Sequence, residues 1–165
     1  MAALEGPAQL ILIGTPTDRL EWGTRLGATH VIDLSATTTD ERRDEVLRLT
    51  CGKGAEIVIE AAGVPEAFAE GLELLARGGR YLVSGLYSGE RKVAINPVII
   101  NNRVLTIIGN LGAVKVHRSR SVELAAALER RFSISELVTH RFGLSEVTEA
   151  IESLGAGATK SVVVP

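Results

Sequence analysis

Two short runs, 56-EIVIEAAG-63 and 79-GRYLVSGLYSG-89, decide the fold of this chain. Each is an apolar stretch that reaches a glycine, and the segment between them, 66-EAFAEGLELLAR-77, has the apolar spacing of an amphipathic helix. A strand, a helix and a strand of this combined length predict a right-handed crossover between parallel strands. Small residues at the strand ends leave room beyond the carboxyl edge of the sheet, where such sheets bind flat ligands.

The sequence on both sides continues this alternation. Further strands are predicted over 9–14, 30–34, 104–110, 137–142 and 160–164, and further helices over 18–27, 40–50, 119–131 and after Ser145. Alternating strands and helices predict an α/β fold with a Rossmann-like, doubly wound parallel sheet. The chain shows no G-x-G-x-x-G loop between a strand and a helix, so the phosphate-binding turn of such folds is missing. The same absence argues against a doubly wound methyltransferase.

Composition narrows the class of protein. The net charge of −2 gives no electrostatic case for binding nucleic acid or anionic membranes. No apolar stretch approaches the roughly 20 residues that cross a bilayer, and the N-terminus does not resemble a signal peptide. Cys51 is the single cysteine, which favours a reducing, cytoplasmic location. Arg42 and Arg43 stand beside acidic residues on a predicted helix, where a solvated face is expected.

The end of the first strand, 14-GTPTDR-19, is a candidate ribose contact. In a dinucleotide site an acidic residue at such a strand tip selects the ribose 2′-hydroxyl. Here the tip is Gly14-Thr15, with Arg19 one turn into the helix, and this neutral tip beside a guanidinium tolerates a 2′-phosphate. The alternative is an ordinary turn followed by a surface arginine.

Other chemistry-bearing residues give weaker signals. Glu60 lies on a strand near the expected crevice and is either catalytic or paired, and pairing is favoured. His30, His117 and His140 share no metal-ligand spacing, so no metal site is predicted. No serine stands in a G-x-S-x-G elbow, so a hydrolase is not indicated.

The runs 25-RLGATHVIDL-34, 52-GKGAEIVIEAAGVPEAFAEGLELLARGGRYLVSGLYSG-89, 103-RVLTIIGN-110 and 137-LVTHRFGLSEVTEAIE-152 carry a family resemblance. In this order they resemble the C-terminal half of a zinc-type medium-chain alcohol dehydrogenase, close to the sorbitol and threonine dehydrogenases. The resemblance implies a partial dinucleotide-binding Rossmann domain over 1–136, without its first strand and Gly-rich loop. It also implies that 137–165 is a β-α-β segment returning to the catalytic domain.

The resemblance implies a set of cofactor-binding residues and no catalytic or metal-binding ones. Gly14, Thr15 and Arg19 match the contacts to the adenosine ribose, and Lys160 matches a basic residue that reaches the pyrophosphate. The remaining matches surround the nicotinamide: Ala61, Ala62, Gly63 and Val64 at one strand end, Ser84, Gly85 and Leu86 at the next, and Gly109 and Asn110 beside them. The implied cofactor is NAD or NADP, and Gly14 with Arg19 favours NADP. Zinc is expected only in the absent catalytic domain.

The implied activity is hydride transfer between an alcohol or polyol substrate and nicotinamide, with this chain alone incomplete and inactive. The alternative is a non-catalytic nucleotide-binding or interaction module. Family members pair through the outermost strand, here 104–109, so a homo-oligomer is expected. Small-molecule alcohols are the expected substrates, and the resemblance implies that the substrate pocket lies mostly in the absent catalytic domain.

The missing first strand has a physical consequence. In this fold it would stand in the middle of the sheet, between the pair 9–14/30–34 and the trio 56–62/80–86/104–109. Each unpaired buried backbone group costs roughly 1–3 kcal/mol. We therefore expect the isolated chain either to close the gap by direct pairing of the two halves or to be poorly stable.

Overall fold

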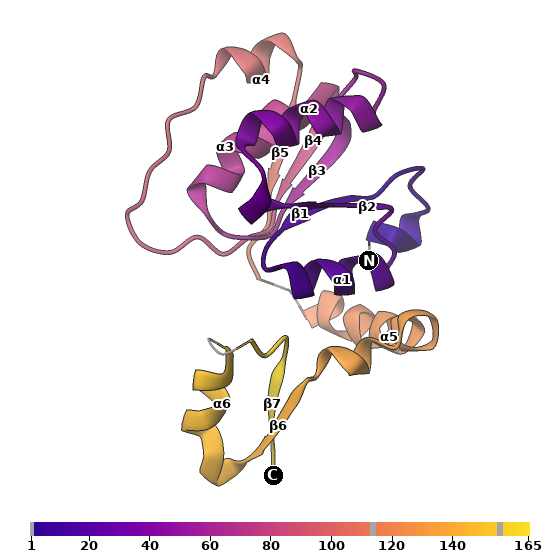
Figure 1. Cartoon of the computed structure of the whole chain (residues 1–165), viewed down its shortest axis with the longest axis vertical. Helices are drawn as coiled ribbons and strands as arrows, with labels where there is room; N and C mark the ends of the chain where they lie inside the picture. The colour runs from indigo at the N-terminus through magenta and orange to yellow at the C-terminus, as the bar shows by residue number, and fades with distance from the viewer. Residues whose placement is uncertain (1, 113–114, 155–156) are drawn as a thin grey trace. The chain divides into compact units, whose positions relative to one another are not determined.

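The computed structural model describes residues 2–112, 115–154 and 157–165 (Figure 1). For residues 115–117 it describes the backbone alone. The described elements are η1 (Ala2–Glu5), β1 (Ile11–Gly14), α1 (Thr17–Arg25), β2 (His30–Asp33), η2 (Leu34–Ala36), α2 (Thr39–Leu49), β3 (Ala55–Glu60), α3 (Pro65–Leu74), β4 (Leu75–Val83), α4 (Val98–Asn102), β5 (Thr106–Gly109), α5 (Lys115–Phe132), η3 (Ile134–Leu137), β6 (His140–Gly143), η4 (Leu144–Glu146), α6 (Val147–Ser153) and β7 (Ser161–Val164). All described strand pairs are parallel, so the predicted α/β class with parallel sheets is confirmed.

The chain forms two compact units, Met1–Ser35 with Ala113–Pro165, and Ala36–Gly112. In the first unit, β1 pairs with β2, and α1 packs on this pair. The same unit contains the pair β6–β7 with α6 beside it. The predicted boundary between 1–136 and 137–165 stays a prediction.

The second unit holds the sheet β3-β4-β5, and α3 makes the predicted crossover from β3 to β4 (Figure 1). Its core consists of Leu72, Leu75 and Tyr81. The ring of Phe68 stacks on Tyr81 with centroids 5.3 Å apart. The Tyr81 hydroxyl donates to the carbonyl of Phe68 at 3.0 Å, and a Cβ on Gly71 would lie 2.2 Å from that hydroxyl oxygen. A glycine in α3 therefore lets the tyrosine reach the helix backbone.

Arg42 differs from its predicted place on a solvated face. It is 6% exposed and forms an ion pair with Glu70 of α3, while its neighbour Arg43 pairs with the exposed Asp40. Burial of Arg42 is possible because its guanidinium also donates to the carbonyl of Thr37 and the hydroxyl of Thr39, so its N–H groups have acceptors.

Three further details differ from the sequence expectation. The helix predicted over 66–77 ends at Leu74, because Leu75 already pairs with Ala55 in the sheet. The loop before the last strand of the trio contains the short helix α4. Among the described residues, β1-β2 and β3-β4-β5 are separate sheets, so direct pairing of the two halves, the first of the two expected outcomes, is not observed. Low stability of the isolated chain stays a prediction.

Candidate cofactor-binding site

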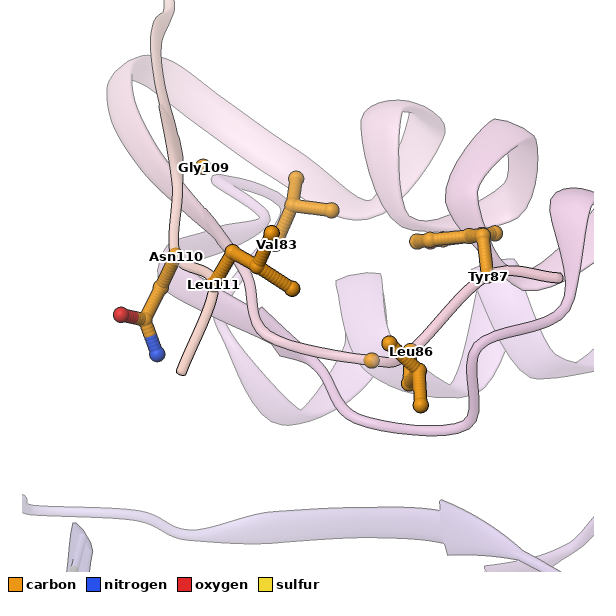
Figure 2. Close-up of a pocket in the computed structure, with 7 residues that line it drawn as sticks. Val83, Leu86, Tyr87, Gly109, Asn110 and Leu111 are labelled. Atoms are coloured by element: carbon orange, nitrogen blue, oxygen red, sulfur yellow. The ribbon is translucent and has the colours of Figure 1, made fainter. Parts of the chain in front are cut away.

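A pocket of about 400 Å³ lies at the carboxyl ends of β4 and β5. Its lining consists of Val83, Gly85, Leu86, Tyr87, Gly109, Asn110 and Leu111. Figure 2 shows Leu86 and Tyr87 on one side of it and Asn110 with Leu111 on the other, with Val83 between them. Parallel sheets bind ligands beyond this edge, so the pocket stands where the fold predicts a site.

The backbone joins three strand ends at this pocket. The N–H groups of Ser84 and Gly85 donate to the carbonyl of Glu60 at 2.9 and 3.0 Å, and the N–H of Asn110 donates to the carbonyl of Val83 at 3.0 Å. The predicted residues of the second unit are thereby brought together: Ala61, Ala62, Gly63 and Val64 after β3, Ser84, Gly85 and Leu86 after β4, and Gly109 and Asn110 at the end of β5.

Glycines let these strand ends approach closely. A Cβ on Gly63 would lie 2.5 Å from the carbonyl oxygen of Leu86, and a Cβ on Gly85 would lie 2.3 Å from the nitrogen of Gly63. Gly63 also has a φ of +70°, which disfavours other residues. A Cβ on Gly109 would meet nothing within 4 Å, so space is open at this point of the pocket wall.

Glu60 fastens the ends of β3 and β4 to each other. It is 4% exposed, and its Oε1 accepts hydrogen bonds from the N–H groups of Ala62 and Gly63, both at 2.7 Å. Its Oε2 accepts a hydrogen bond from the hydroxyl of Tyr87. Burial and this hydrogen bond raise the pKa of Tyr87 above its ordinary value. The Glu60 carboxylate is therefore paired through hydrogen bonds and is not exposed to solvent.

Tyr87 was missed by sequence reasoning. Its side chain both lines the pocket and reaches Glu60, which lies 27 positions earlier in the chain. A tyrosine after 84-SGL-86 carries no periodicity or spacing that would indicate either contact.

The first unit contains the residues predicted for the adenosine end. Gly14 ends β1 opposite Asp33 at the end of β2, and Thr15 follows exposed. Asp33 accepts a hydrogen bond from the hydroxyl of Thr17 at 2.7 Å. The carboxylate of Asp33 therefore lies at the end of β2, the strand that pairs with β1. The sequence alone did not indicate this residue.

Arg19 and Lys160 belong to the same unit. A guanidinium nitrogen of Arg19 donates to the carbonyl of Ala158 at 3.5 Å. The carbonyl of Lys160 accepts the N–H groups of Thr139 and His140 at 3.0 and 3.2 Å, which fixes its backbone while its side chain stays exposed. Hydrogen bonds therefore hold the side chain of Arg19 and the backbone of Lys160 within this unit.

The described donor side chains do not form a metal site. In the part of the chain that the structure describes, no group of three or more His, Cys, Asp or Glu side chains could hold a metal ion. The side chain of His117 lies outside the described residues.

Comparison with known proteins identifies the family. The model of the zinc-binding dehydrogenases matches residues 1–129, and the chain belongs to this family. It is 35% identical over 158 residues to 5-exo-hydroxycamphor dehydrogenase of Pseudomonas putida, covering 96% of this chain and 44% of that protein. D-xylulose reductase of Saccharomyces cerevisiae is 27% identical, with 92% of this chain and 42% of that protein covered. The predicted relationship to zinc-type alcohol dehydrogenases is confirmed.

Solved structures agree with the fold. An alcohol dehydrogenase of Thermotoga maritima superposes with a TM-score of 0.91 at 29% identity, covering 99% of this chain and 45% of that one. A protein of Sinorhizobium meliloti described as a zinc-binding dehydrogenase, solved with NADP, has a TM-score of 0.81 at 27% identity, with 99% and 47% covered. The chain therefore has the Rossmann-like fold of these proteins and spans less than half the length of the relatives it matches. None of its described helices is long and apolar enough to cross a membrane.

Proposed function

We propose that this chain is the nicotinamide-cofactor-binding portion of a zinc-dependent oxidoreductase that oxidises an alcohol or polyol. The observation that carries the proposal is the pocket at the carboxyl ends of β4 and β5, built from the strand ends that the family resemblance assigns to nicotinamide. Relatives named hydroxycamphor dehydrogenase and xylulose reductase support an alcohol or polyol substrate.

The pocket residues would hold the nicotinamide through their backbone. Polar groups of Ser84–Leu86 and Gly109–Asn110 other than the N–H groups already bonded to Glu60 and Val83 would pair with a carboxamide, and Ala61–Val64 supply small residues at the neighbouring strand end. When bound, nicotinamide accepts a hydride from the alcohol carbon. The chain's own contribution would be to hold this ring at the sheet edge against the side chains of Val83, Leu86 and Tyr87.

The adenosine end would be held by residues of the first unit. Gly14 and Thr15 would face the ribose, Arg19 would pair with a 2′-phosphate, and Lys160 would reach the pyrophosphate. A neutral strand tip and a nearby guanidinium favour NADP over NAD. The NADP-bound relative from S. meliloti is consistent with this preference.

The described residues do not provide a ligand set for zinc. In the proposed enzyme, zinc and the alcohol would be held by the catalytic domain that the family resemblance implies. A cytoplasmic location is proposed from the unpaired, exposed Cys51.

We also propose that the protein forms homo-oligomers through β5. All four residues of this strand are exposed, including the apolar Ile107 and Ile108, and β4 covers one of its edges. A bare apolar edge favours pairing with another strand. Light scattering of the protein and of an Ile108→Lys variant tests this: an oligomer that the lysine dissociates is expected, and a wild-type monomer at high concentration would contradict it.

Calorimetric titration with NADP⁺ and NAD⁺ tests the proposed function, followed by an assay for alcohol-dependent reduction of the cofactor that binds. Saturable binding with tighter association of NADP⁺ is expected. Binding with turnover in the protein at its natural length supports the oxidoreductase, and binding without turnover favours the non-catalytic module. The absence of binding by either cofactor would contradict the proposal.

A further inference from the structure

The carboxylate of Glu60 lies directly behind the pocket wall. Its Oε2 accepts the hydroxyl of Tyr87, which lines the pocket. The same oxygen is 2.5 Å from the position that a Cβ on Gly85 would occupy, and Gly85 lines the pocket as well. Because Gly85 has no side chain, the carboxylate approaches the pocket with only backbone in between at this point.

The charge of this carboxylate is not offset by a cation. All three groups that donate to it, the N–H groups of Ala62 and Gly63 and the hydroxyl of Tyr87, are neutral. Both oxygens of this side chain act as acceptors in these hydrogen bonds. None of the ion pairs found among the described residues includes Glu60. Since the group is 4% exposed, water screens its field little, and the field extends into the pocket.

We propose that Glu60 biases the pocket toward the oxidised, positively charged nicotinamide and against the reduced, neutral one. The inference rests on the proposed function and adds a residue that sets the redox preference of the bound cofactor. In the proposed reaction the alcohol would become a carbonyl, its hydride would pass to the oxidised ring and make it neutral, and its hydroxyl proton would leave to solvent. The oxidised and reduced rings are close in shape and differ by one charge. Packing contacts therefore bind the two forms about equally, and the field of Glu60 favours the charged one.

This bias would favour the oxidised cofactor over the reduced product in competition for the empty site, because the charge tightens binding of the cationic ring and changes binding of the neutral ring little. Tyr87 has a positioning role, because its hydroxyl holds the carboxylate against the Gly85 side of the pocket. Glu60 touches neither substrate nor hydride, and it acts through its charge.

Separate calorimetric titrations with NADP⁺ and NADPH, or with NAD⁺ and NADH if that pair binds more tightly, test the proposal. Glu60→Gln keeps the size of the side chain and an oxygen that can accept the two N–H groups. We expect it to weaken binding of the oxidised cofactor about tenfold more than binding of the reduced one, because it removes one unit of negative charge beside the pocket. The exposed Glu66, which pairs with Arg91 on the surface, provides the control: Glu66→Gln leaves the ratio of the two dissociation constants unchanged.

A second matched pair covers the case in which Glu60→Gln fails to fold. Glu60→Asp and Glu60→Asn both lose one methylene and differ from each other in charge. Relative to the aspartate variant, the asparagine variant is expected to bind the oxidised cofactor about tenfold more weakly than it binds the reduced one. Equal weakening of both cofactor forms would mean that Glu60 only shapes the loop, and it would overturn the inference while leaving the proposed function intact. Failure of the wild-type protein to bind either form would overturn both.

Discussion

Arg42 of α2 and Glu70 of α3 form a two-pronged ion pair inside the second unit, with Nε to Oε1 at 2.6 Å and Nη2 to Oε2 at 2.8 Å. Their side chains are 7% and 14% exposed. The pair joins the helix that precedes β3 to the helix that follows it, so it links α2 to α3, the helix that packs on β3 and β4. The hydrogen bond with Glu70 raises the pKa of Arg42, which keeps this guanidinium charged.

Arg42→Met is expected to lower the free energy of unfolding by about 3 kcal/mol, because it leaves the Glu70 carboxylate poorly solvated and without its partner. Urea denaturation measures this change. Adding Glu70→Leu to the variant should restore part of the loss, since both charges are then gone. Arg43→Met, at an exposed surface pair, serves as the control and should change stability by less than about 0.5 kcal/mol. A similar loss in both arginine variants would contradict the assignment.

The capping box of α2 predicts a pH-dependent stability. Glu41 accepts the N–H of Thr38 at 2.7 Å and its hydroxyl at 2.8 Å, and these bonds lower the pKa of Glu41 below 4.5. When the pKa of a carboxyl group is lower in the folded state than in the unfolded state, the group stabilises the fold. This stabilisation is complete above the unfolded-state pKa and disappears as the pH falls through the folded-state pKa. Glu41→Gln should therefore be less stable than the wild type at neutral pH, with the difference shrinking below about pH 4.5. Chemical denaturation across this range measures it, and a difference that grows toward acid would be the wrong sign.

Gly63→Ala is expected to damage both stability and the pocket. The new Cβ would lie 2.5 Å from the carbonyl oxygen of Leu86, at a backbone φ of +70°. Such strain costs about 1–3 kcal/mol, and Leu86, which lines the pocket, would have to move. Gly109→Ala is the matched comparison, because its Cβ meets nothing within 4 Å, and we expect its stability to stay within about 0.5 kcal/mol of the wild type. Equal melting temperatures for the Gly63 variant and the wild type would refute the close packing.

Cofactor choice should respond to the tip of β1. Gly14→Asp places a carboxylate where a 2′-phosphate would sit, so the ratio of NADP⁺ to NAD⁺ affinity should fall by roughly tenfold or more. Arg19→Ala should weaken NADP⁺ more than NAD⁺. Arg48→Ala removes an exposed cation of α2 that pairs with Glu45, and it should leave the ratio unchanged. An unchanged ratio in both the Gly14 and Arg19 variants would contradict the ribose assignment.

The sequence was sufficient to predict the sheet of the second unit and the three strand ends that converge on the pocket. Apolar runs that stop at small residues, such as the one ending at Gly63, are local signals of β3 and β4. The helix boundary at Leu74 was predicted three residues too late, because apolar residues at the end of α3 and the start of β4 satisfy both periodicities. Pairing with Ala55 decides in favour of the strand.

Long-range polar contacts could not be predicted in the same way. Arg42 carries the local signature of a surface residue, and only the packing of α2 against α3 brings Glu70 within reach of it. The contact of Glu60 with Tyr87 likewise depends on the path of the loop after β4. Such contacts are set by tertiary structure, and no spacing in a single sequence indicates them.

Assignment of backbone amide resonances during a titration with NADP⁺ is the most direct measurement of the central claim. We predict saturable shifts in the amides of Ser84, Gly85, Leu86, Gly109 and Asn110, at the strand ends beside the pocket. Amides of exposed residues away from the pocket, such as those of Glu56 and Arg77, should shift little. Saturable binding that leaves the pocket amides unmoved, or no binding at all, would contradict the claim that this pocket receives nicotinamide.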